Sequence, residues 1–305
     1  MKAFIIKAIV WIVILITPIS ICFYIYGITP YISNNQSINH KLYVSSQCIK
    51  GPLQVTAIGS SITLNNLYSP TIVSELGSSF YNFGCSGLNI SSIQFMTEFY
   101  LKKYKYKTLI IVSQIEDFNP DQPFTFPTEW EFNMMYEKHY SLLSFFSPFK
   151  SFTPFTSINT DSSDLACQKY DAWGEARLHI NKKNVQKERW DAIYKKYDKE
   201  SSYQSLEKIC QLSKDNNISL IFTISPYKKG FVTKGEAAAD YQKHINRCRY
   251  ILNKYEYQLY DFSQDPHFDE SHFADVIHLN EQGAILFTQL LCEQLHCKKK
   301  PEGAE

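Results

Sequence analysis

Short apolar stretches alternate with longer amphipathic stretches along most of the chain. The short stretches are rich in β-branched and aromatic residues and are bounded by glycine, serine and asparagine, a pattern typical of buried strands. Strands are predicted at 53–59, 79–84, 107–113, 218–225 and 257–263.

The stretches between these strands repeat apolar residues at helical spacing. Strands that alternate with helices indicate a parallel sheet with right-handed crossovers, covered by helices on both faces. We therefore expect a three-layer α/β/α fold with a mostly parallel, flavodoxin-like central sheet. Helices are predicted at 68–77, 90–104, 202–214, 236–254 and 281–296.

The N-terminus has a different pattern. Residues 8–28 carry no charge and are long enough to cross a bilayer core of about 30 Å. No small-residue cleavage site follows them, which favours a signal anchor over a cleaved signal peptide. Lys2 and Lys7 favour a cytoplasmic N-terminus. We predict one transmembrane helix within residues 1–30, with the remaining chain outside the cytoplasmic (inner) membrane, in the periplasm if the cell is Gram-negative.

The rest of the chain is predicted as one domain with an insertion. Residues 31–52 are expected to be a linker, and 53–298 an α/β domain. The alternation of elements breaks at about 119–200, which is rich in Phe, Pro, Tyr and Trp and is predicted as an insertion. Its aromatic residues favour a small core of their own over a sugar-binding platform. Residues 299–305 are expected to be a disordered tail.

The composition of the chain limits the classes of partner and cofactor that are expected. The chain has 305 residues and a net charge of +1 without a long basic block, which argues against nucleic acid. Of 8 cysteines, only Cys22 falls in the predicted anchor, so an odd number remains outside and cannot all pair within one chain. Disulfides and buried thiols both stay open. No Cys/His spacing indicates a metal, and we expect no cofactor.

Polar residues follow three successive predicted strands. Gly59-Ser60-Ser61 ends the first, Asn82-Phe83-Gly84 ends the second, and Gln114-Ile115-Glu116-Asp117 follows the third. Asp275 and His278 precede the last predicted helix. Because functional groups gather at the carboxyl ends of parallel strands, these four segments are expected to share one edge of the sheet.

This constellation resembles the SGNH (GDSL-type) hydrolase superfamily. The resemblance implies that Ser61 is the nucleophile, His278 the general base and Asp275 its orienting acid, with the backbone amides of Ser61 and Gly84 as oxyanion donors. The segment "HLNEQGAILFT", which begins at His278, is similar to a membrane-anchored extracytoplasmic branch related to alginate O-acetylation and D-alanyl-transfer proteins.

The chain departs from that superfamily at two positions. Ser60 replaces the usual acidic residue before the nucleophile. In the third block, where Gly-x-Asn-Asp is expected, Glu116 holds the place of the asparagine. An ionised carboxylate cannot donate to an oxyanion, and a missing donor costs about 100- to 1000-fold in rate. Two remedies stay open: Gln114 supplies an amide, or Glu116 is protonated.

Each site residue also has a structural alternative. Ser61 could cap the helix that follows it. A second Asp-x-x-His occurs at Asp269 and His272, but it lacks the Leu-Asn and the glycine that follow His278, so we interpret it as a loop.

The sequence thus predicts a serine acyl esterase or O-acyltransferase, with acetyl as the first acyl group to consider. The expected substrate is a cell-surface or exported polysaccharide or another acylated molecule, and envelope proteins are possible partners. A catalytically inactive scaffold or glycan-binding protein is one alternative, favoured by Glu116. A thioesterase acting on carrier-bound acyl groups is another.

Overall fold

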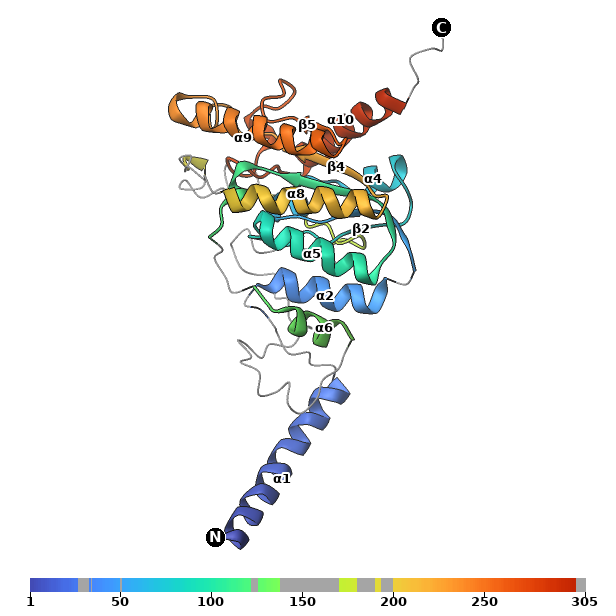
Figure 1. The fold of residues 1–305 in the computed structure, drawn as a ribbon, viewed down its shortest axis with the longest axis vertical. Coiled ribbons are helices and arrows are strands. Elements are labelled where there is room, and N and C mark those ends of the chain that lie inside the picture. Colours follow the sequence, from blue (N-terminus) through green and yellow to red (C-terminus); the bar gives the residue numbers. More distant parts are fainter. Residues whose placement is uncertain are drawn as a thin grey trace. The chain divides into compact units, whose positions relative to one another are not determined.

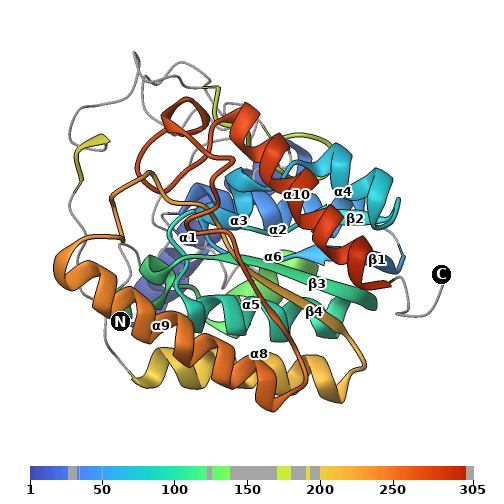
Figure 2. The ribbon, with the colours of Figure 1, turned by 90° about the horizontal axis from the view of Figure 1, so that it is seen from above.

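Five parallel strands form the sheet that carries the site, in the order β2-β1-β3-β4-β5. Figure 1 labels β2, β4 and β5, and Figure 2 labels β1 to β4. The strands are β1 (Leu53–Ala57), β2 (Phe80–Asn82), β3 (Tyr106–Ser113), β4 (Ser219–Ile224) and β5 (Leu259–Asp261). The computed structural model describes residues 1–26, 33, 35–49, 51–121, 126–137, 170–179, 190–192 and 200–299.

Helices cover both faces of this sheet (Figure 2). The helices on one face are α3 (Ser61–Asn66), α4 (Ser69–Glu75) and α10 (Glu281–Lys299). Those on the other face are α5 (Ile90–Lys103), α8 (Glu200–Asp215) and α9 (Gly235–Lys254). The predicted α/β fold with a parallel central sheet is confirmed. Strand and helix positions agree with the sequence pattern to within a few residues at each end.

Alternate residues of the central strands build the core beneath α3, α4 and α10. Val55, Ala57, Ile110 and Val112 are all buried, as expected for strands covered by helices. The helices contribute the complementary apolar side chains Ile62, Leu67, Ile72, Phe287 and Leu291.

The strand order decides where a site can form. The chain leaves β1 for β2 on one side and then crosses to β3 on the other, so strand order reverses at β1. In open α/β sheets such a reversal leaves a crevice beyond the carboxyl ends of the strands. Ser61 lies directly after β1, at this switch point.

The chain divides into two compact units. One comprises Met1–Ile49 and Phe124–Asn159, and the other Lys50–Pro123 and Thr160–Glu305. The first unit contains α1 (Lys2–Tyr26), α2 (Gln36–Cys48) and α6 (Glu129–Glu137).

Helix α2 lies where the sequence predicted a linker. The side chain of Asn35 caps it by accepting from the amides of Ser37 and Ile38, and Ile38 and Leu42 are buried one turn apart. The few apolar positions of this largely polar stretch were too weak a pattern to predict this helix from the sequence.

Helix α1 coincides with the apolar N-terminal stretch. Several of its large apolar side chains are exposed, among them Phe4, Trp11 and Leu15. Among the residues that the structure describes, no helix combines the length and the apolarity needed to cross a membrane. The transmembrane helix predicted at residues 1–30 is therefore not supported by the structure. Most of the predicted insertion at 119–200 lies outside the described residues, and so does the predicted tail except Lys299, which ends α10. The predicted domain boundaries stay predictions.

Candidate active site

Ser61 is the first residue of α3, immediately after the turn that leaves β1. Gly59 is needed in this turn, because a Cβ there would lie 1.9 Å from Thr63 Oγ1. The helix cap is Ser60, whose hydroxyl accepts from the Ile62 amide at 3.1 Å. The capping role considered for Ser61 therefore falls on its neighbour, and the Ser61 hydroxyl is left to make another contact.

Helix α3 is fastened to the sheet by two polar side chains. Thr63 Oγ1 donates to the Val112 carbonyl at 2.8 Å and accepts from the Val112 amide at 3.0 Å. Asn82 Nδ2, at the end of β2, donates to the Thr63 carbonyl at 2.9 Å. These bonds hold α3 against β3 and β2, the two strands that pair with β1.

Asp275 and His278 form a self-contained turn before α10. Asp275 Oδ1 accepts from the backbone amides of Ile277 at 2.9 Å and His278 at 2.7 Å. Asp275 Oδ2 lies 2.8 Å from His278 Nδ1. The spacing of three residues therefore has a local cause: it lets one carboxylate hold both the backbone and the ring of the histidine.

The two ends of the chain meet at this point. His278 Nε2 lies 2.8 Å from Ser61 Oγ. A proton on Nδ1 satisfies the carboxylate of Asp275, which leaves Nε2 as the acceptor for the Ser61 hydroxyl. Burial opposes ionisation of Asp275, but His278 and the two amides outweigh it and hold the pKa of this carboxyl below its usual value. The arrangement has the geometry required of a nucleophile, a general base and an orienting acid.

Two buried amide side chains hold the peptide that precedes His278. Gln114 Nε2 donates to the Ile277 carbonyl and to the Pro226 carbonyl, both at 3.1 Å. Asn66, in α3, donates to the Ile277 carbonyl at 3.4 Å and accepts from the Leu279 amide at 3.0 Å. Sequence reasoning did not identify Asn66, since a single asparagine in a short helix carries no spacing signal.

Two of the predicted oxyanion donors have other partners. The Gly84 amide donates to Asn82 Oδ1 at 2.8 Å, because the asparagine side chain folds back over the turn after β2. Both Gln114 donor bonds go to backbone carbonyls, so its amide positions the histidine loop and does not face the reacting centre. Only the Ser61 amide, of the predicted donors, has no acceptor within the described part of the chain.

Two carboxyl groups lie in the short helix η1 (Ile115–Phe118) that follows β3. Asp117 Oδ2 accepts from the Ser113 hydroxyl at 2.9 Å, and burial raises the pKa of Asp117 to about 6 against the opposing bonds from Ser60 and Ser113. Glu116 Oε2 accepts from the Tyr227 hydroxyl at 3.0 Å. Burial raises the pKa of Glu116 to about 7, although the Tyr227 bond and His278 lower it.

The second Asp-x-x-His is a local turn, as predicted. Asp269 caps the short helix η4 (Glu270–His272), accepting from the Ser271 amide at 2.8 Å. His272 Nδ1 in turn accepts from the Asp269 amide at 3.2 Å. The side chains of Asp269 and His272 make their hydrogen bonds within this turn, whereas the His278 ring contacts the Ser61 hydroxyl.

A segment of the predicted insertion, residues 170–179, lies against the nucleophile helix. The Ala176 amide donates to the Leu64 carbonyl of α3 at 3.2 Å, and the Asn82 amide donates to the Trp173 carbonyl at 2.8 Å. The aromatic composition that suggested a separate small core gave no indication of this contact.

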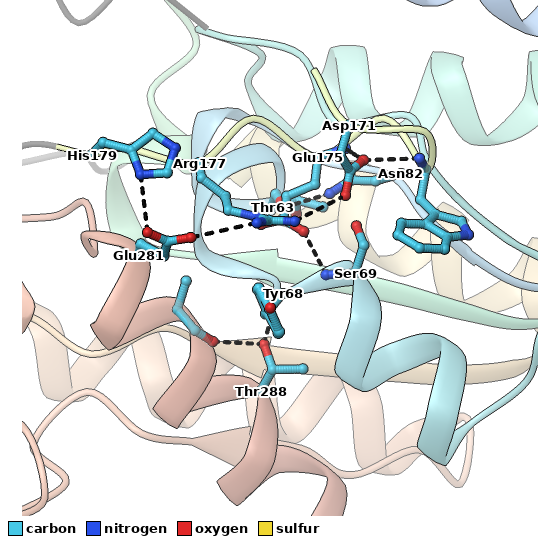
Figure 3. A network of polar contacts seen from close by, with 12 residues as sticks. Thr63, Tyr68, Ser69, Asn82, Asp171, Glu175, Arg177, His179, Glu281 and Thr288 are labelled. Carbon is cyan, nitrogen blue, oxygen red and sulfur yellow. Dashed lines mark hydrogen bonds and ion pairs between the residues drawn. The ribbon is translucent and has the colours of Figure 1, made fainter. Parts of the chain in front are cut away.

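Figure 3 shows the ion-pair network that fastens this segment. The fully buried Glu175 carboxylate accepts from the Ser69 amide at 2.5 Å and pairs with Arg177 Nε at 2.9 Å. Arg177 also reaches Glu281 of α10 at 3.4 Å, and His179 lies 3.0 Å from Glu281. Burial raises the pKa of Glu175 to about 7, and the Ser69 amide and Arg177 act against that rise.

Replacing Arg177 by methionine should lower the free energy of unfolding by about 3–5 kcal/mol, because it leaves the buried Glu175 carboxylate without its cation. A carboxyl whose pKa is raised in the folded state adds stability below its unfolded pKa and loses it as pH rises through its folded pKa. The loss should therefore be larger at about pH 8 than at about pH 6. Urea denaturation measures it. The double variant Glu175→Gln/Arg177→Met should recover part of the loss, and a double variant less stable than Arg177→Met would contradict this account.

Among the described cysteines, Cys210, Cys248, Cys292 and Cys297 are free thiols. Within the described ranges, His, Cys, Asp and Glu side chains form no group of three or more that could hold a metal ion.

Part of the chain is similar to a known protein family. Residues 175–293 match the DltD family, described as "DltD protein". Among curated proteins none matches the chain.

Several solved structures are similar at low sequence identity. One described as an acylhydrolase, from Bacteroides fragilis NCTC 9343, is 10% identical, with 87% of this chain and 99% of that chain covered and a TM-score of 0.47. A GDSL-like lipase from Bacteroides thetaiotaomicron VPI-5482 is 10% identical, with 86% and 98% covered and a TM-score of 0.47. A protein from Lactobacillus plantarum is 12% identical, with 83% and 99% covered and a TM-score of 0.45.

The matched range includes Asp275, His278 and the start of α10, which is the segment that carried the predicted similarity. The resemblance to D-alanyl-transfer proteins that was inferred from this segment is confirmed by the match of residues 175–293 to the DltD family.

Proposed function

We propose that this protein is a serine acyl esterase or O-acyltransferase that uses Ser61, His278 and Asp275. One observation carries the proposal: the His278 ring lies between the Ser61 hydroxyl and the Asp275 carboxylate, 2.8 Å from each. The match to the DltD family supports the same general class of acyl-transfer chemistry.

The proposed reaction has two steps. His278 Nε2 takes the Ser61 proton as Ser61 Oγ attacks the ester carbonyl, and Asp275 stabilises the imidazolium that forms. The ester C–O bond then breaks, and the leaving alcohol takes the proton from His278. In the second step His278 Nε2 takes a proton from water or a sugar hydroxyl as that oxygen attacks the acyl carbonyl. The bond between the acyl carbon and Ser61 Oγ breaks, and Ser61 Oγ takes the proton from His278. Attack by water gives an esterase, and attack by a sugar hydroxyl gives a transferase.

The substrate and the location are further parts of the proposal. Acetyl is the first acyl group to test, and a cell-surface or exported polysaccharide is the proposed acceptor or donor. Lys2 and Lys7 before the apolar stretch, and the exposed apolar side chains of α1, support attachment to a membrane with the catalytic residues outside the cytoplasm. Protease added to spheroplasts, whose cytoplasmic membrane is intact, should digest the α/β domain, and a domain that is protected until this membrane is lysed would contradict this location.

The full-length protein should hydrolyse p-nitrophenyl acetate and release p-nitrophenol in a burst as the acyl-serine accumulates. Adding an oligosaccharide to the assay separates the two reactions: a transferase forms an acylated sugar at the expense of free acetate, and an esterase does not. A protein that shows neither a burst nor turnover, with acetyl and aminoacyl esters alike, would favour the inactive scaffold.

A further inference from the structure

Glu116 occupies the place of the oxyanion-donating asparagine, and its environment differs from that of an ordinary surface carboxylate. Its Oε2 accepts from the Tyr227 hydroxyl at 3.0 Å. Its Oε1 is buried and has no hydrogen-bond partner among the described residues. No lysine or arginine of the described part pairs with it. A buried oxygen in this state is costly if the carboxyl is ionised.

The position of Glu116 relative to the reacting groups follows from the sheet. Strands β1 and β3 are parallel neighbours, so the residues after β3 lie beside the turn that carries Ser61. Gln114, two residues before Glu116, bonds to the Ile277 carbonyl next to His278. The His278 charge is close enough to lower the pKa of Glu116. The unpartnered oxygen therefore belongs to a carboxyl group at the site.

Among the described residues, few of the expected groups are free to donate a hydrogen bond to an oxyanion. The Gly84 amide and the Gln114 side chain, both predicted to face the oxyanion, donate to Asn82 Oδ1 and to backbone carbonyls. The Ser61 amide remains, whereas oxyanion sites of this kind usually combine several donors. Within this site Glu116 is the residue whose free oxygen, once protonated, supplies another.

We propose that Glu116 acts as a neutral carboxylic acid whose Oε1 hydroxyl donates to the oxyanion formed when Ser61 attacks the ester. This proposal rests on the proposed function. The Tyr227 hydroxyl holds the other oxygen, and itself accepts from the Ile115 amide at 2.9 Å, which fixes its direction. Glu116 keeps its proton throughout the reaction. Its hydrogen bond to the substrate oxygen strengthens as negative charge develops there, and no proton is transferred.

The groups that face Glu116 are consistent with a neutral form. Desolvation raises its pKa to about 7, Asp117 on the same turn raises it, and the bond from Tyr227 and the charge of His278 lower it. Tyr241 packs edge-on against Tyr227, with ring centroids 5.7 Å apart, and contributes no positive charge.

The pH dependence of hydrolysis by Glu116 variants tests the proposal. Full-length wild type, Glu116→Gln, Glu116→Leu and the exposed control Glu236→Gln are compared on p-nitrophenyl acetate from about pH 5 to about pH 9. Wild type and Glu236→Gln should lose activity as pH rises above about 7. Glu116→Gln, whose amide donates at every pH, should keep activity there. Glu116→Leu should lose about 100- to 1000-fold in kcat throughout.

A parallel assay with an aminoacyl p-nitrophenyl ester separates this role from recognition of a substrate ammonium by an ionised Glu116. Equal retention of both activities in Glu116→Gln supports the neutral acid. Loss of the aminoacyl activity alone overturns it, and so does a Glu116→Gln variant as impaired as Glu116→Leu.

Infrared difference spectra between wild type and Glu116→Gln measure the protonation state of the Glu116 carboxyl without any substrate turnover. The carbonyl stretch of a carboxylic acid should be present in slightly acidic solution and disappear as pH rises. An active protein without this band overturns the Glu116 proposal alone, whereas a protein without any esterase activity overturns it together with the proposed function.

Discussion

Ser61→Ala should reduce the turnover of p-nitrophenyl acetate by about 10⁴-fold or more, because the variant cannot form the acyl-serine. The hydroxyl contacts His278 Nε2 and has no capping role, since Ser60 caps α3. The fold should therefore be unaffected, and the free energy of unfolding measured in urea should change by less than about 1 kcal/mol.

Ser74→Ala is the matched control for that substitution. Ser74 lies exposed in α4, and its hydroxyl bonds to the Thr71 carbonyl and the Glu75 carboxylate. Its activity should equal that of wild type. If Ser61→Ala retained a tenth of wild-type turnover while Ser74→Ala was normal, the nucleophile would have to be another group.

Asp275→Asn should lower kcat by about 10⁴-fold with a small change in KM. The asparagine retains the size of the side chain but offers an amide or a neutral carbonyl to His278 Nδ1. It favours the ring tautomer that carries a proton on Nε2, and that nitrogen then cannot accept the Ser61 proton. Steady-state kinetics at neutral pH measure the effect.

Asp269→Asn is the matched control for Asp275→Asn. It alters the other Asp-x-x-His pair, which is engaged in the turn η4. Its kcat should stay within a few-fold of wild type. Comparable losses in the two variants would contradict the assignment of His278, and a loss confined to Asp269→Asn would transfer the role to His272.

The fold was predictable because its elements have strong local patterns. Buried parallel strands appear as short β-branched runs, and the crossover helices between them are amphipathic, so β3, β4, α8 and α9 were found close to their observed bounds. Helices α2 and α3 were not predicted, because one has few apolar positions and the other is a single short turn after β1.

The meeting of Ser61 with His278 was predictable for a different reason. Both residues lie at carboxyl ends of strands or just before a helix, and a parallel sheet brings all such positions to one edge. The oxyanion donors could not be predicted in this way, since a motif gives the position of an amide but not its hydrogen-bond partner. Asn82 and the Ile277 carbonyl occupy the donors of Gly84 and Gln114, and only three-dimensional contacts reveal this.

The ion-pair network of Glu175 and Arg177 was equally invisible in the sequence. Its members come from three separate segments, 171–179, α4 and α10, and no regular spacing links them. Charged residues are usually solvent-exposed, and nothing in the sequence marks Glu175 as an exception. Its burial is therefore known only from the structure.

Mapping of a fluorophosphonate adduct by mass spectrometry tests most directly whether the first serine of α3 is an activated nucleophile. The full-length protein is treated with the probe, digested and sequenced. We expect a single modified peptide with the phosphonate on Ser61, and no modification in His278→Ala, where the base is absent. An unmodified protein, or an adduct on another serine that persists in His278→Ala, would contradict the account.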